Sequence, residues 1–245
     1  MNLLVFIICF PTDSLFAPDR VYLFAEHLYE EGDYPAALAE FRRYIFLTDS
    51  PPGDVPEKIV KCLLAMERYD EARAECGQWA PSARREYFTG WIYFRAGNYD
   101  STRAVIKRTG PPYAAEARRL LGLSFAEDDD FKNAGVYISL PQPLPRRRSL
   151  WAGGAFSLIP GGGHFYAGKP DDGIYSALIV GTASLLAYYY HGRQEGMKFG
   201  VSLTAAIVFY AGSIYGGLNA CQNQNRFVNE RYRERVREEN FINFK

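Results

Sequence analysis

The chain of 245 residues lacks an excess of charge of either sign, because 28 Lys and Arg residues balance 28 Asp and Glu residues. This neutrality argues against a general nucleic-acid binder, which would carry a basic excess. Apolar residues make up 48% of the chain and charged residues 23%, and this composition excludes wholesale disorder.

Cysteine and histidine are scarce. The four cysteines form no C-x-x-C pair and no zinc-type spacing, and the three histidines have no carboxylate partners at ligand spacing. Cys62 and Cys76 could meet on adjacent antiparallel helices, so a disulfide is one reading. Two buried thiols in a helical core is the favoured reading, because free cysteine is commonly buried.

The chain also lacks the common catalytic and nucleotide motifs. It has no G-x-S-x-G elbow, no P-loop and no G-x-G-x-x-G that opens a helix after a strand. The run Gly161–Gly163 is rich in glycine, but no G-K-[ST] follows it. We therefore expect no catalytic residue, no cofactor, no metal and no enzymatic activity.

Charge is distributed very unevenly along the chain. Residues 18–148 hold 20 acidic and 19 basic side chains, whereas residues 149–225 hold only six charged side chains and 14 of the 22 glycines. A helix that spans a bilayer needs about 20 mainly apolar residues. We predict an all-α chain in which a soluble half (residues 18–140) precedes a membrane half (residues 149–225).

The membrane half contains two stretches that are long enough to span a bilayer, at about residues 173–192 and 197–221. The first ends in Tyr188–Tyr190, which is typical of an aromatic belt at a membrane interface. Two G-x-x-x-G pairs predict that the spans pack closely as a hairpin, and they make a homo-oligomer a further expectation. The pairs are Gly196 with Gly200, and Gly212 with Gly216.

The N-terminal residues 1–17 contain a short apolar run, Leu3–Phe10. The run is too short for a span but has the length of a signal-peptide core, with Ala17 as the last residue before cleavage. The n-region carries no Lys or Arg, so an uncleaved anchor or a truncated longer signal remains an alternative.

Residues 18–140 contain a repeat. Tyr34, Tyr69, Tyr99 and Phe131 are separated by 35, 30 and 32 residues, and apolar residues recur at helical spacing before and after each of them. The pattern predicts a helix–turn–helix unit repeated four times. Prolines near the unit ends, where they stop a helix, agree with this division; these are Pro51, Pro81, Pro111 and Pro141.

The units resemble the tetratricopeptide repeat, whose 34-residue pattern has small residues at 8 and 20, Gly at 15, Tyr at 17 and an apolar residue at 24. Unit two departs most, since Val60 and Glu67 replace a small residue and the glycine. The matching residues at 8, 15, 17 and 24 are Ala25, Gly32, Tyr34 and Phe41 in unit one, Gly90, Gly97, Tyr99 and Ile106 in unit three, and Gly122, Asp129, Phe131 and Ile138 in unit four. The resemblance implies an α-solenoid.

Tetratricopeptide arrays bind other proteins in a groove lined by the first helix of each unit. The resemblance places ten residues of this chain in the groove: Tyr22, Glu26, Tyr29, Glu57, Lys61, Tyr87, Trp91, Phe94, Arg95 and Arg119. The residues at 87, 91, 94 and 95 share one helical face, and aromatics and arginine are the usual hot spots of interfaces. The alternative is that these aromatics pack within the array.

Between the two halves, the proline-rich residues 141–145 predict a stiff, extended linker, and Arg146–Arg148 follow it beside the membrane half. After the second span, residues 226–245 alternate Arg and Glu, with an apolar seam at Val228, Tyr232 and Val236. We expect this tail to be a helix that continues from the span or lies on the headgroups.

The start of the membrane half resembles two families of small membrane domains. One carries G-x-H-x-F-Y-x-G-x-x-x-x-G before its first of two spans, and the other is a bacterial domain with P-G-x-G-x-x-Y-x-G-K. Here no residue separates the histidine from the phenylalanine, and neither family implies a reaction. The matching residues are Pro160, Gly161, Gly163, His164, Phe165, Tyr166, Gly168, Lys169 and Gly173.

We expect the glycines of this motif to permit a tight turn, and Tyr166 and Lys169 to anchor the start of the span. His164 either acts by titrating or by binding lipid phosphate, or has no function of its own. Leu150–Leu158, upstream of the motif, is half a span long and either lies at the interface or dips into the membrane.

Two spans would place the repeats and the tail on the same side of the membrane. The positive-inside rule favours the cytoplasm for the arginine-rich segments, whereas a signal peptide would export the repeats. We expect a protein of the bacterial inner membrane with a periplasmic array that binds a protein partner and assists assembly of an envelope complex. The alternatives are an accessory subunit of a membrane enzyme or transporter that acts through His164–Lys169, and a self-associating structural protein.

Overall fold

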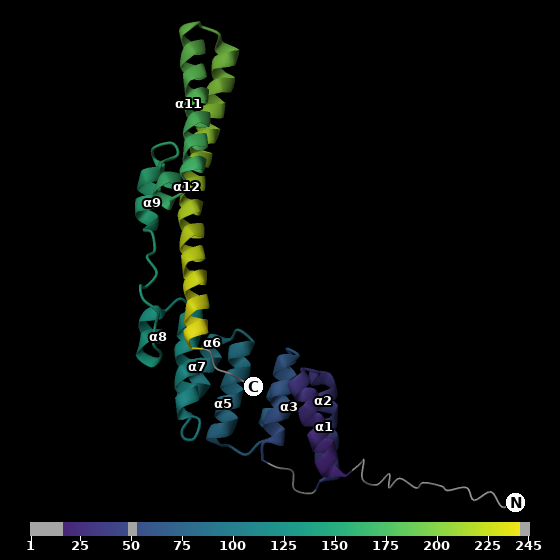
Figure 1. The fold of residues 1–245 in the computed structure, drawn as a ribbon. Coiled ribbons are helices and arrows are strands. Elements are labelled where there is room, and N and C mark those ends of the chain that lie inside the picture. Colours follow the sequence, from purple (N-terminus) through teal and green to yellow (C-terminus); the bar gives the residue numbers. More distant parts are fainter. Residues whose placement is uncertain (1–16, 49–52, 241–245) are drawn as a thin grey trace, which may run out of the picture. The chain divides into compact units, whose positions relative to one another are not determined.

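The computed structural model describes residues 17–48 and 53–240 (Figure 1). Within these residues the chain forms twelve α-helices and no strand, which confirms the all-α class. The predicted signal peptide lies outside the described residues, except for Ala17.

The chain divides into two compact units. The first unit ends at Leu140 and also takes in Asn240, and the second covers Pro141–Glu239. The division therefore falls where the sequence places the end of the repeats.

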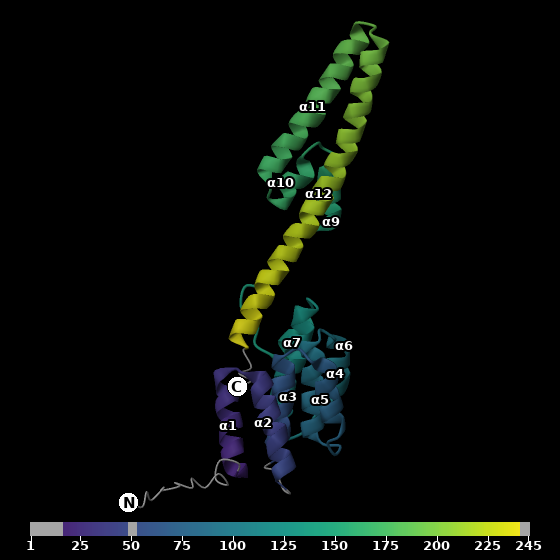
Figure 2. The same ribbon diagram turned by 90° about the vertical axis from the view of Figure 1, so that its right-hand side faces the viewer.

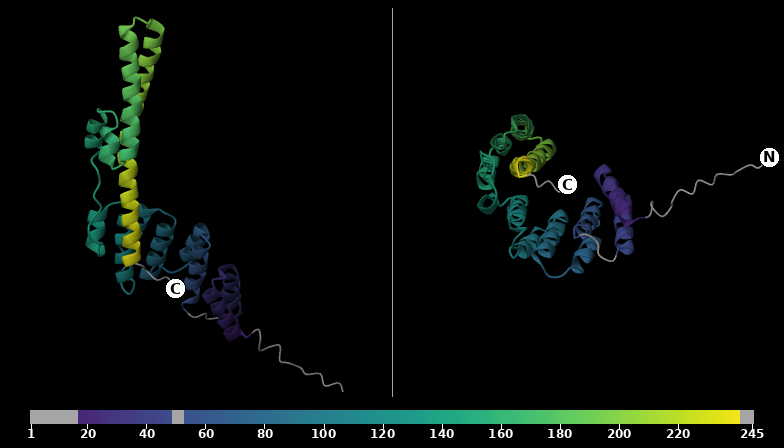
Figure 3. Two further views of the ribbon diagram at one scale, coloured as in Figure 1. Left: turned by 45° about the horizontal axis from the view of Figure 1, so that its top comes forward. Right: turned by 60° about the horizontal axis from the view of Figure 1, so that its bottom comes forward.

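The first unit consists of four helix pairs, each joined by a short turn. Each helix packs against the next one along the chain, and the first helices of neighbouring pairs also touch, α3 with α5 and α5 with α7. Figures 2 and 3 show the pairs following one another in chain order. The helices are α1 (Pro18–Glu31), α2 (Tyr34–Leu47), α3 (Val55–Ala65), α4 (Tyr69–Gly77), α5 (Ala83–Arg95), α6 (Tyr99–Ile106), α7 (Ala114–Glu127) and α8 (Phe131–Tyr137).

The turn inside each pair has the same left-handed backbone. Its residues are Gly32, Glu67, Gly97 and Asp129, with φ angles of 84°, 58°, 74° and 61°. Left-handed backbone is easy for glycine and costs other residues energy. The sequence repeat therefore marks one recurring backbone conformation. The second and fourth helix pairs adopt it with Glu67 and Asp129 in place of glycine.

The second helix of three pairs begins at a side chain that caps it. Asp33, Asn98 and Asp130 each accept a hydrogen bond from the backbone N–H three residues later, at 3.2, 3.1 and 3.2 Å. Such caps satisfy N–H groups that the first turn of a helix leaves without partners. In the second pair Arg68 stands at this position and makes no cap bond.

Inside the pairs, the small residues of the repeat let the two helices approach closely. A Cβ atom added at Gly90 would lie 2.8 Å from Cδ1 of Ile106, and one added at Gly122 would lie 2.6 Å from Cγ2 of Ile138. These are the two repeat positions that the sequence aligns, 8 and 24. In the third and fourth pairs an isoleucine of the second helix is therefore packed directly on a glycine of the first.

The second unit contains two short helices, α9 (Leu150–Ser157) and α10 (Gly162–Ala167), and two long ones, α11 (Pro170–Gly192) and α12 (Gly196–Glu239). By length and composition, α11 and α12 could each cross a membrane. They pack against each other as a hairpin. α12 runs without a break from the second predicted span into the tail, which confirms that the tail continues this helix as far as Glu239.

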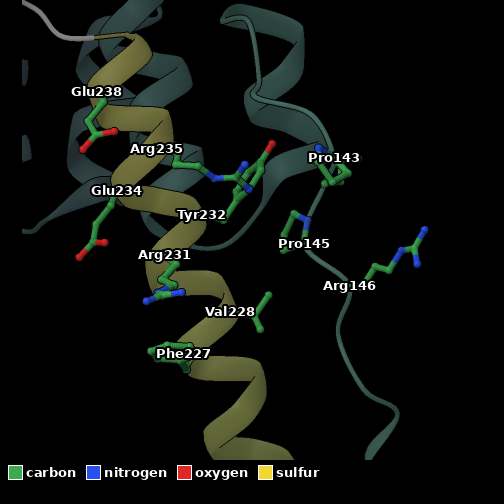
Figure 4. A pocket seen from close by; sticks show the side chains of 11 residues that line it. Pro143, Pro145, Arg146, Phe227, Val228, Arg231, Tyr232, Glu234, Arg235 and Glu238 are labelled. Carbon is green, nitrogen blue, oxygen red and sulfur yellow. The ribbon is translucent and has the colours of Figure 1, made fainter. Parts of the chain in front are cut away.

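The segment 141–148, which the sequence predicts to be a spacer, is extended but is held along α12. The hydroxyl of Tyr232 donates to the carbonyl of Pro141 at 2.9 Å, and Nε of Arg147 donates to Oδ1 of Asn229 at 3.0 Å. The groove left between the segment and α12 is lined by Pro143, Pro145, Tyr232 and Arg235, among other residues (Figure 4). This segment is therefore part of the second unit.

The shared turn conformation predicts opposite effects of matched substitutions. Glu67→Gly should raise the free energy of unfolding by roughly 0.5–1 kcal/mol, because it removes the strain of a Cβ atom on left-handed backbone, at some cost in the entropy of the unfolded chain. Gly97→Glu should lower it by roughly 1–2 kcal/mol. Hydrogen exchange of peptides from α3–α6 measures both changes in the full chain.

Gly77→Glu is the control, because Gly77 lies in α4 without left-handed backbone and a Cβ there meets nothing within 4 Å. A destabilising Glu67→Gly variant would contradict the account of the turn.

Candidate functional site

The predicted groove face of the first unit carries polar contacts between first helices. Lys58 of α3 binds Glu26 of α1, and its ammonium also donates to the hydroxyl of Tyr22 at 3.0 Å. Although burial acts to lower the pKa of Lys58, these bonds raise it above its usual value. Two of the predicted groove residues, Tyr22 and Glu26 of α1, therefore connect the first helix pair to the second.

Glu57 makes the corresponding contacts further along the array. Its Oε1 lies 2.7 Å from Nε of Arg84 in α5 and accepts a 2.8 Å hydrogen bond from the hydroxyl of Tyr113, which precedes α7. Burial, and then the bond to Glu57, raise the pKa of Tyr113 to about 12. The carboxylate of Glu57 thus joins the second helix pair to Arg84 of the third pair and to Tyr113 at the start of the fourth.

Two of the predicted hot-spot aromatics are not available to a partner. Tyr87 is 5% exposed and Trp91 2% exposed. Tyr87 stacks on Tyr113 with ring centroids 5.0 Å apart, and Trp91 lies edge-on to Phe88 at 5.9 Å. The prediction that Tyr87 and Trp91 bind a partner is therefore wrong, and the alternative, packing within the array, holds for them.

The remaining predicted groove residues keep part of their surface. Phe94 is half-buried against Tyr99, and Tyr29 is half-buried against Tyr34. Lys61 is half-buried, whereas Arg95 and Arg119 are exposed. Three of the predicted groove residues are therefore cations with solvent-accessible side chains: Lys61, Arg95 and Arg119, each from a different helix pair.

Cys62 and Cys76 are free thiols, and both are buried. The disulfide that the sequence left open is therefore not formed. Burial raises the pKa of each thiol to about 12, so both stay protonated at neutral pH. Among the described residues, no cluster of three or more His, Cys, Asp or Glu side chains could hold a metal ion.

In the second unit, the glycine-rich motif forms the turn between α9 and α10 and the turn into α11. Gly161 and Gly168 adopt left-handed backbone, at φ 79° and 82°, and Pro160 precedes the first of them. Gly168 ends α10, and the exposed Lys169 occupies the N-cap position of α11 without a side-chain capping bond. The expected tight turns are thus located at these two glycines.

The other motif glycines are points of close contact. A Cβ atom added at Gly163 would lie 2.8 Å from Cα of Gly217 in α12, and one added at Gly217 would lie 2.9 Å from Cα of Gly163. Gly173 of α11 faces the ring of Phe165, at 2.8 Å from an added Cβ, and the carbonyl of Gly161. These contacts join α10 to both long helices.

Tyr166 anchors the start of the unit by its hydroxyl and by its ring. The hydroxyl accepts a 3.1 Å hydrogen bond from the backbone N–H of Ser149. The ring stacks on Phe156 with centroids 5.2 Å apart, and the guanidinium of Arg148 lies 5.4 Å from its centroid. Tyr166 of α10 therefore contacts both Arg148 and α9.

The break between α9 and α10 is held by hydroxyl groups of α12. The hydroxyl of Tyr210 donates to the carbonyl of Leu158 at 2.8 Å, and the N–H of Gly161 donates to Oγ of Ser213 at 3.0 Å. Ser176 of α11 also donates to Oγ of Ser213, at 2.7 Å. Two backbone groups at the break, the carbonyl of Leu158 and the N–H of Gly161, are thus bonded to side chains of α12.

His164 lies beside this network and is half-buried. Its Nε2 packs on Gly216, where an added Cβ would lie 2.9 Å away, and its Nδ1 is buried without a hydrogen-bond partner. It lines a cavity of about 430 Å³ together with Ser176, Ser213 and apolar side chains of both long helices. His164, Ser176 and Ser213 thus form a polar cluster where α10 meets the two long helices.

The predicted G-x-x-x-G packing is wrong for three of its four residues. A Cβ atom added at Gly196, Gly200 or Gly212 would meet nothing within 4 Å. Gly216 is in close contact, but with His164 of α10 rather than with α11. The sequence analysis did not identify Ser213, Gly217 and Asn225 as contact residues. Their spacing places them on one face of α12, and this spacing could have indicated a shared contact surface.

The raised thiol pKa values predict a loss of stability at alkaline pH. A pKa of about 12 in the folded chain exceeds the usual value of 9, so folding favours the protonated thiol. The stabilisation of the folded chain by each protonated thiol is complete below pH 9 and is lost as the pH rises toward 12. The free energy of unfolding should fall by up to about 1.4 kcal/mol per pH unit for each thiol. Thermal unfolding measured from pH 7.5 to 11 checks this fall.

The variant Cys62→Ala/Cys76→Ala serves as control and should show a shallower fall with pH. Rapid alkylation of both native thiols at neutral pH would contradict their burial.

Searches against models of protein families, curated proteins and solved structures find no match to this chain. Its assignment therefore depends on its own residues and their contacts.

Proposed function

We propose that this chain is a membrane-anchored scaffold, in which the helical repeats bind a protein partner and the α11–α12 hairpin holds them at a bacterial inner membrane. The partner would belong to an envelope complex whose assembly or stability the scaffold assists. The main support for membrane anchoring is that the apolar side chains of the α11–α12 hairpin are largely exposed.

The most apolar windows of α11 and α12 have only 22% and 17% of their residues buried within the chain. A core helix of a soluble protein would be mostly buried, and neither helix lies near the N-terminus, where signal sequences occur. Large side chains such as Leu178, Leu185 and Ile207 are more than half exposed. Lipid is the environment that makes this exposure favourable.

Both ends of the hairpin carry groups that suit a membrane interface. At the loop end, the guanidinium of Arg193 lies 4.6 Å from the ring centroid of Tyr189, and Lys198 lies 5.4 Å from that of Tyr190. At the other end, where α11 begins, Lys169, Asp171 and Asp172 are exposed. From Gly173 to Gly192 an α-helix rises by about 29 Å, close to the thickness of the hydrocarbon of a bilayer.

The binding role is supported by the repeated helix pairs, which agree with a tetratricopeptide-like solenoid. The left-handed turn recurs in all four pairs, and the small residues at position 8 of units three and four face the apolar residue at 24. The cations Lys61, Arg95 and Arg119 on first helices favour an acidic segment as the partner's contact. We place the repeats and the end of α12 on the same side of the membrane, with the periplasm as the expected side.

Two other functions have an observation in their favour. The buried Nδ1 of His164 beside a cavity supports an accessory role for the His164–Lys169 turn in a membrane enzyme or transporter. The open positions Gly196, Gly200 and Gly212 support self-association of the hairpin, in which a second copy would cover them.

Charge reversal on the first helices tests the binding role. In crosslinking capture from membranes, Arg95→Glu/Arg119→Glu should lose at least about tenfold of the captured partner, as expected when two charged contacts worth about 1 kcal/mol each are removed and replaced by repulsion. Mass spectrometry of the captured proteins measures the loss.

Arg42→Glu/Lys132→Glu is the matched control, because both residues are exposed on the second helices α2 and α8. Equal loss in the control, or full capture by the first variant, would refute binding at the first-helix face.

A further inference from the structure

Two exposed cations of the second unit meet at the turn between α10 and α11. Gly168 forms this turn, and a Cβ atom added to it would lie 3.4 Å from Nη2 of Arg148. The next residue is Lys169, at the N-cap position of α11. Both Arg148 and Lys169 are exposed. The turn thus brings a guanidinium from the arginine segment close to the residue at which the hairpin begins.

Contacts of its backbone and of a tyrosine ring hold Arg148 at this turn. Its N–H donates to Oδ1 of Asn225 at 2.6 Å, and its carbonyl accepts from Nδ2 of the same side chain at 2.8 Å. The guanidinium lies 5.4 Å from the ring centroid of Tyr166, whose hydroxyl accepts from the N–H of Ser149. The guanidinium is therefore positioned by groups that leave its own N–H donors available to a ligand.

Neither cation is paired with an acidic side chain. Among the residues that the structure describes, no Asp or Glu forms an ion pair with Arg148 or Lys169. Asp171 and Asp172 lie in the first turn of α11, where acidic side chains stabilise a helix. The cations of Arg146–Arg148 and Lys169 outnumber these two acids. The turn therefore has an excess of positive charge that suits an anion.

In the proposed membrane anchoring, this turn lies at the depth of the lipid phosphates. With Gly173–Gly192 in the hydrocarbon, Lys169 precedes the edge of the hydrocarbon by about 6 Å along the helix axis. The hydrocarbon of a bilayer is about 30 Å thick and the whole bilayer about 40–45 Å, so each headgroup layer is about 5–7 Å thick. Lys169 and the guanidinium beside Gly168 therefore reach the headgroup layer.

The break between α9 and α10 agrees with this depth. The N–H of Gly161 at the break donates to Oγ of Ser213, which also accepts from Ser176 of α11. The break is therefore level with Ser176, just inside the edge of the hydrocarbon. The side chains exposed there are apolar, with Leu158 64% and Ile159 67% exposed. Apolar side chains at the edge of the hydrocarbon, with cations further out, are typical of a membrane interface.

We propose that Arg148 and Lys169 bind the phosphate of an anionic membrane lipid, with Gly168 leaving room for the guanidinium and Tyr166 holding it in place. A guanidinium presents a planar fork that matches two phosphate oxygens, and an ammonium adds a point charge. The excess of positive charge at the turn favours a lipid with a net negative charge, such as phosphatidylglycerol, over the neutral phosphatidylcholine. The inference rests on the membrane anchoring proposed above.

Native mass spectrometry of the full chain in detergent tests the site. Phosphatidylglycerol and phosphatidylcholine with the same acyl chains are supplied at equal concentrations, and the ratio of the two lipid-bound forms is measured. The native chain should favour phosphatidylglycerol roughly tenfold or more, because each cation near a lipid surface contributes about fivefold. Arg148→Gln/Lys169→Gln should lose most of this preference. The bonds to Asn225 use the backbone of Arg148, so the substitution leaves them in place.

The matched control is Arg231→Gln/Arg235→Gln, which also removes two positive charges from exposed residues of the second unit. The bond between Ser176 and Ser213 places Gly216 level with the start of the hydrocarbon, and Arg231 lies about 22 Å further along α12, beyond the headgroup layer. The control should keep the native preference. An equal loss in the control, or a native preference in Arg148→Gln/Lys169→Gln, would overturn the site.

Two further measurements separate the lipid from other sources of phosphate and from the anchoring. Excess inorganic phosphate, compared with chloride at the same ionic strength, should leave phosphatidylglycerol bound; its displacement would overturn the assignment of a lipid and favour a soluble phosphate. After removal of detergent, the native chain and both variants should float with phosphatidylcholine vesicles. Failure of the native chain to float would contradict the membrane anchoring, whereas flotation without a preference for phosphatidylglycerol would contradict the site alone.

Discussion

One face of α12 supplies the hydrogen bonds on which the second unit depends. Its hydroxyl and amide side chains bond to backbone groups of Pro141, Arg148, Leu158 and Gly161, at donor–acceptor distances of 2.6–3.0 Å. Between them, small residues let α9 and α10 approach. Residues three or four apart share a face of a helix, and the face consists of Tyr210, Ser213, Gly217, Cys221, Asn225, Asn229 and Tyr232. The extended segment, the short helices and the break are therefore positioned by one helix.

The first unit is held by a different kind of interaction. Its pairs pack small residues against large apolar ones, and neighbouring pairs are joined by charged bonds on the first helices, with Lys58 and Glu57 as the central members. These bonds use side chains that a tetratricopeptide groove would offer to a partner. In the proposed scaffold, the exposed cations that remain, Arg95 and Arg119, carry the recognition.

The repeats, the all-α class and the division near residue 140 could be predicted because they depend on local periodicity, on glycine and aromatic spacing, and on the sharp change in charge density. The roles of Tyr87 and Trp91 could not, since the same helical spacing describes a groove and a core, and only the neighbouring Phe88 and Tyr113 decide between them. The glycine pairs misled for a related reason. A G-x-x-x-G pattern shows that one face of a helix lacks side chains, but it does not show which element packs there. In α12 the close glycine contact is between Gly217 and α10.

The central claim is that the face of α12 fixes the backbone of residues 141–161, and amide hydrogen exchange of Arg148 tests it most directly. Asn225→Ala removes the acceptor of this amide and should speed its exchange several-fold, because an amide without its acceptor opens more readily. Asn223→Ala, which changes an exposed asparagine two residues earlier on the same helix, should leave the exchange unchanged. Native protection of Arg148 in the Asn225→Ala variant would contradict the claim.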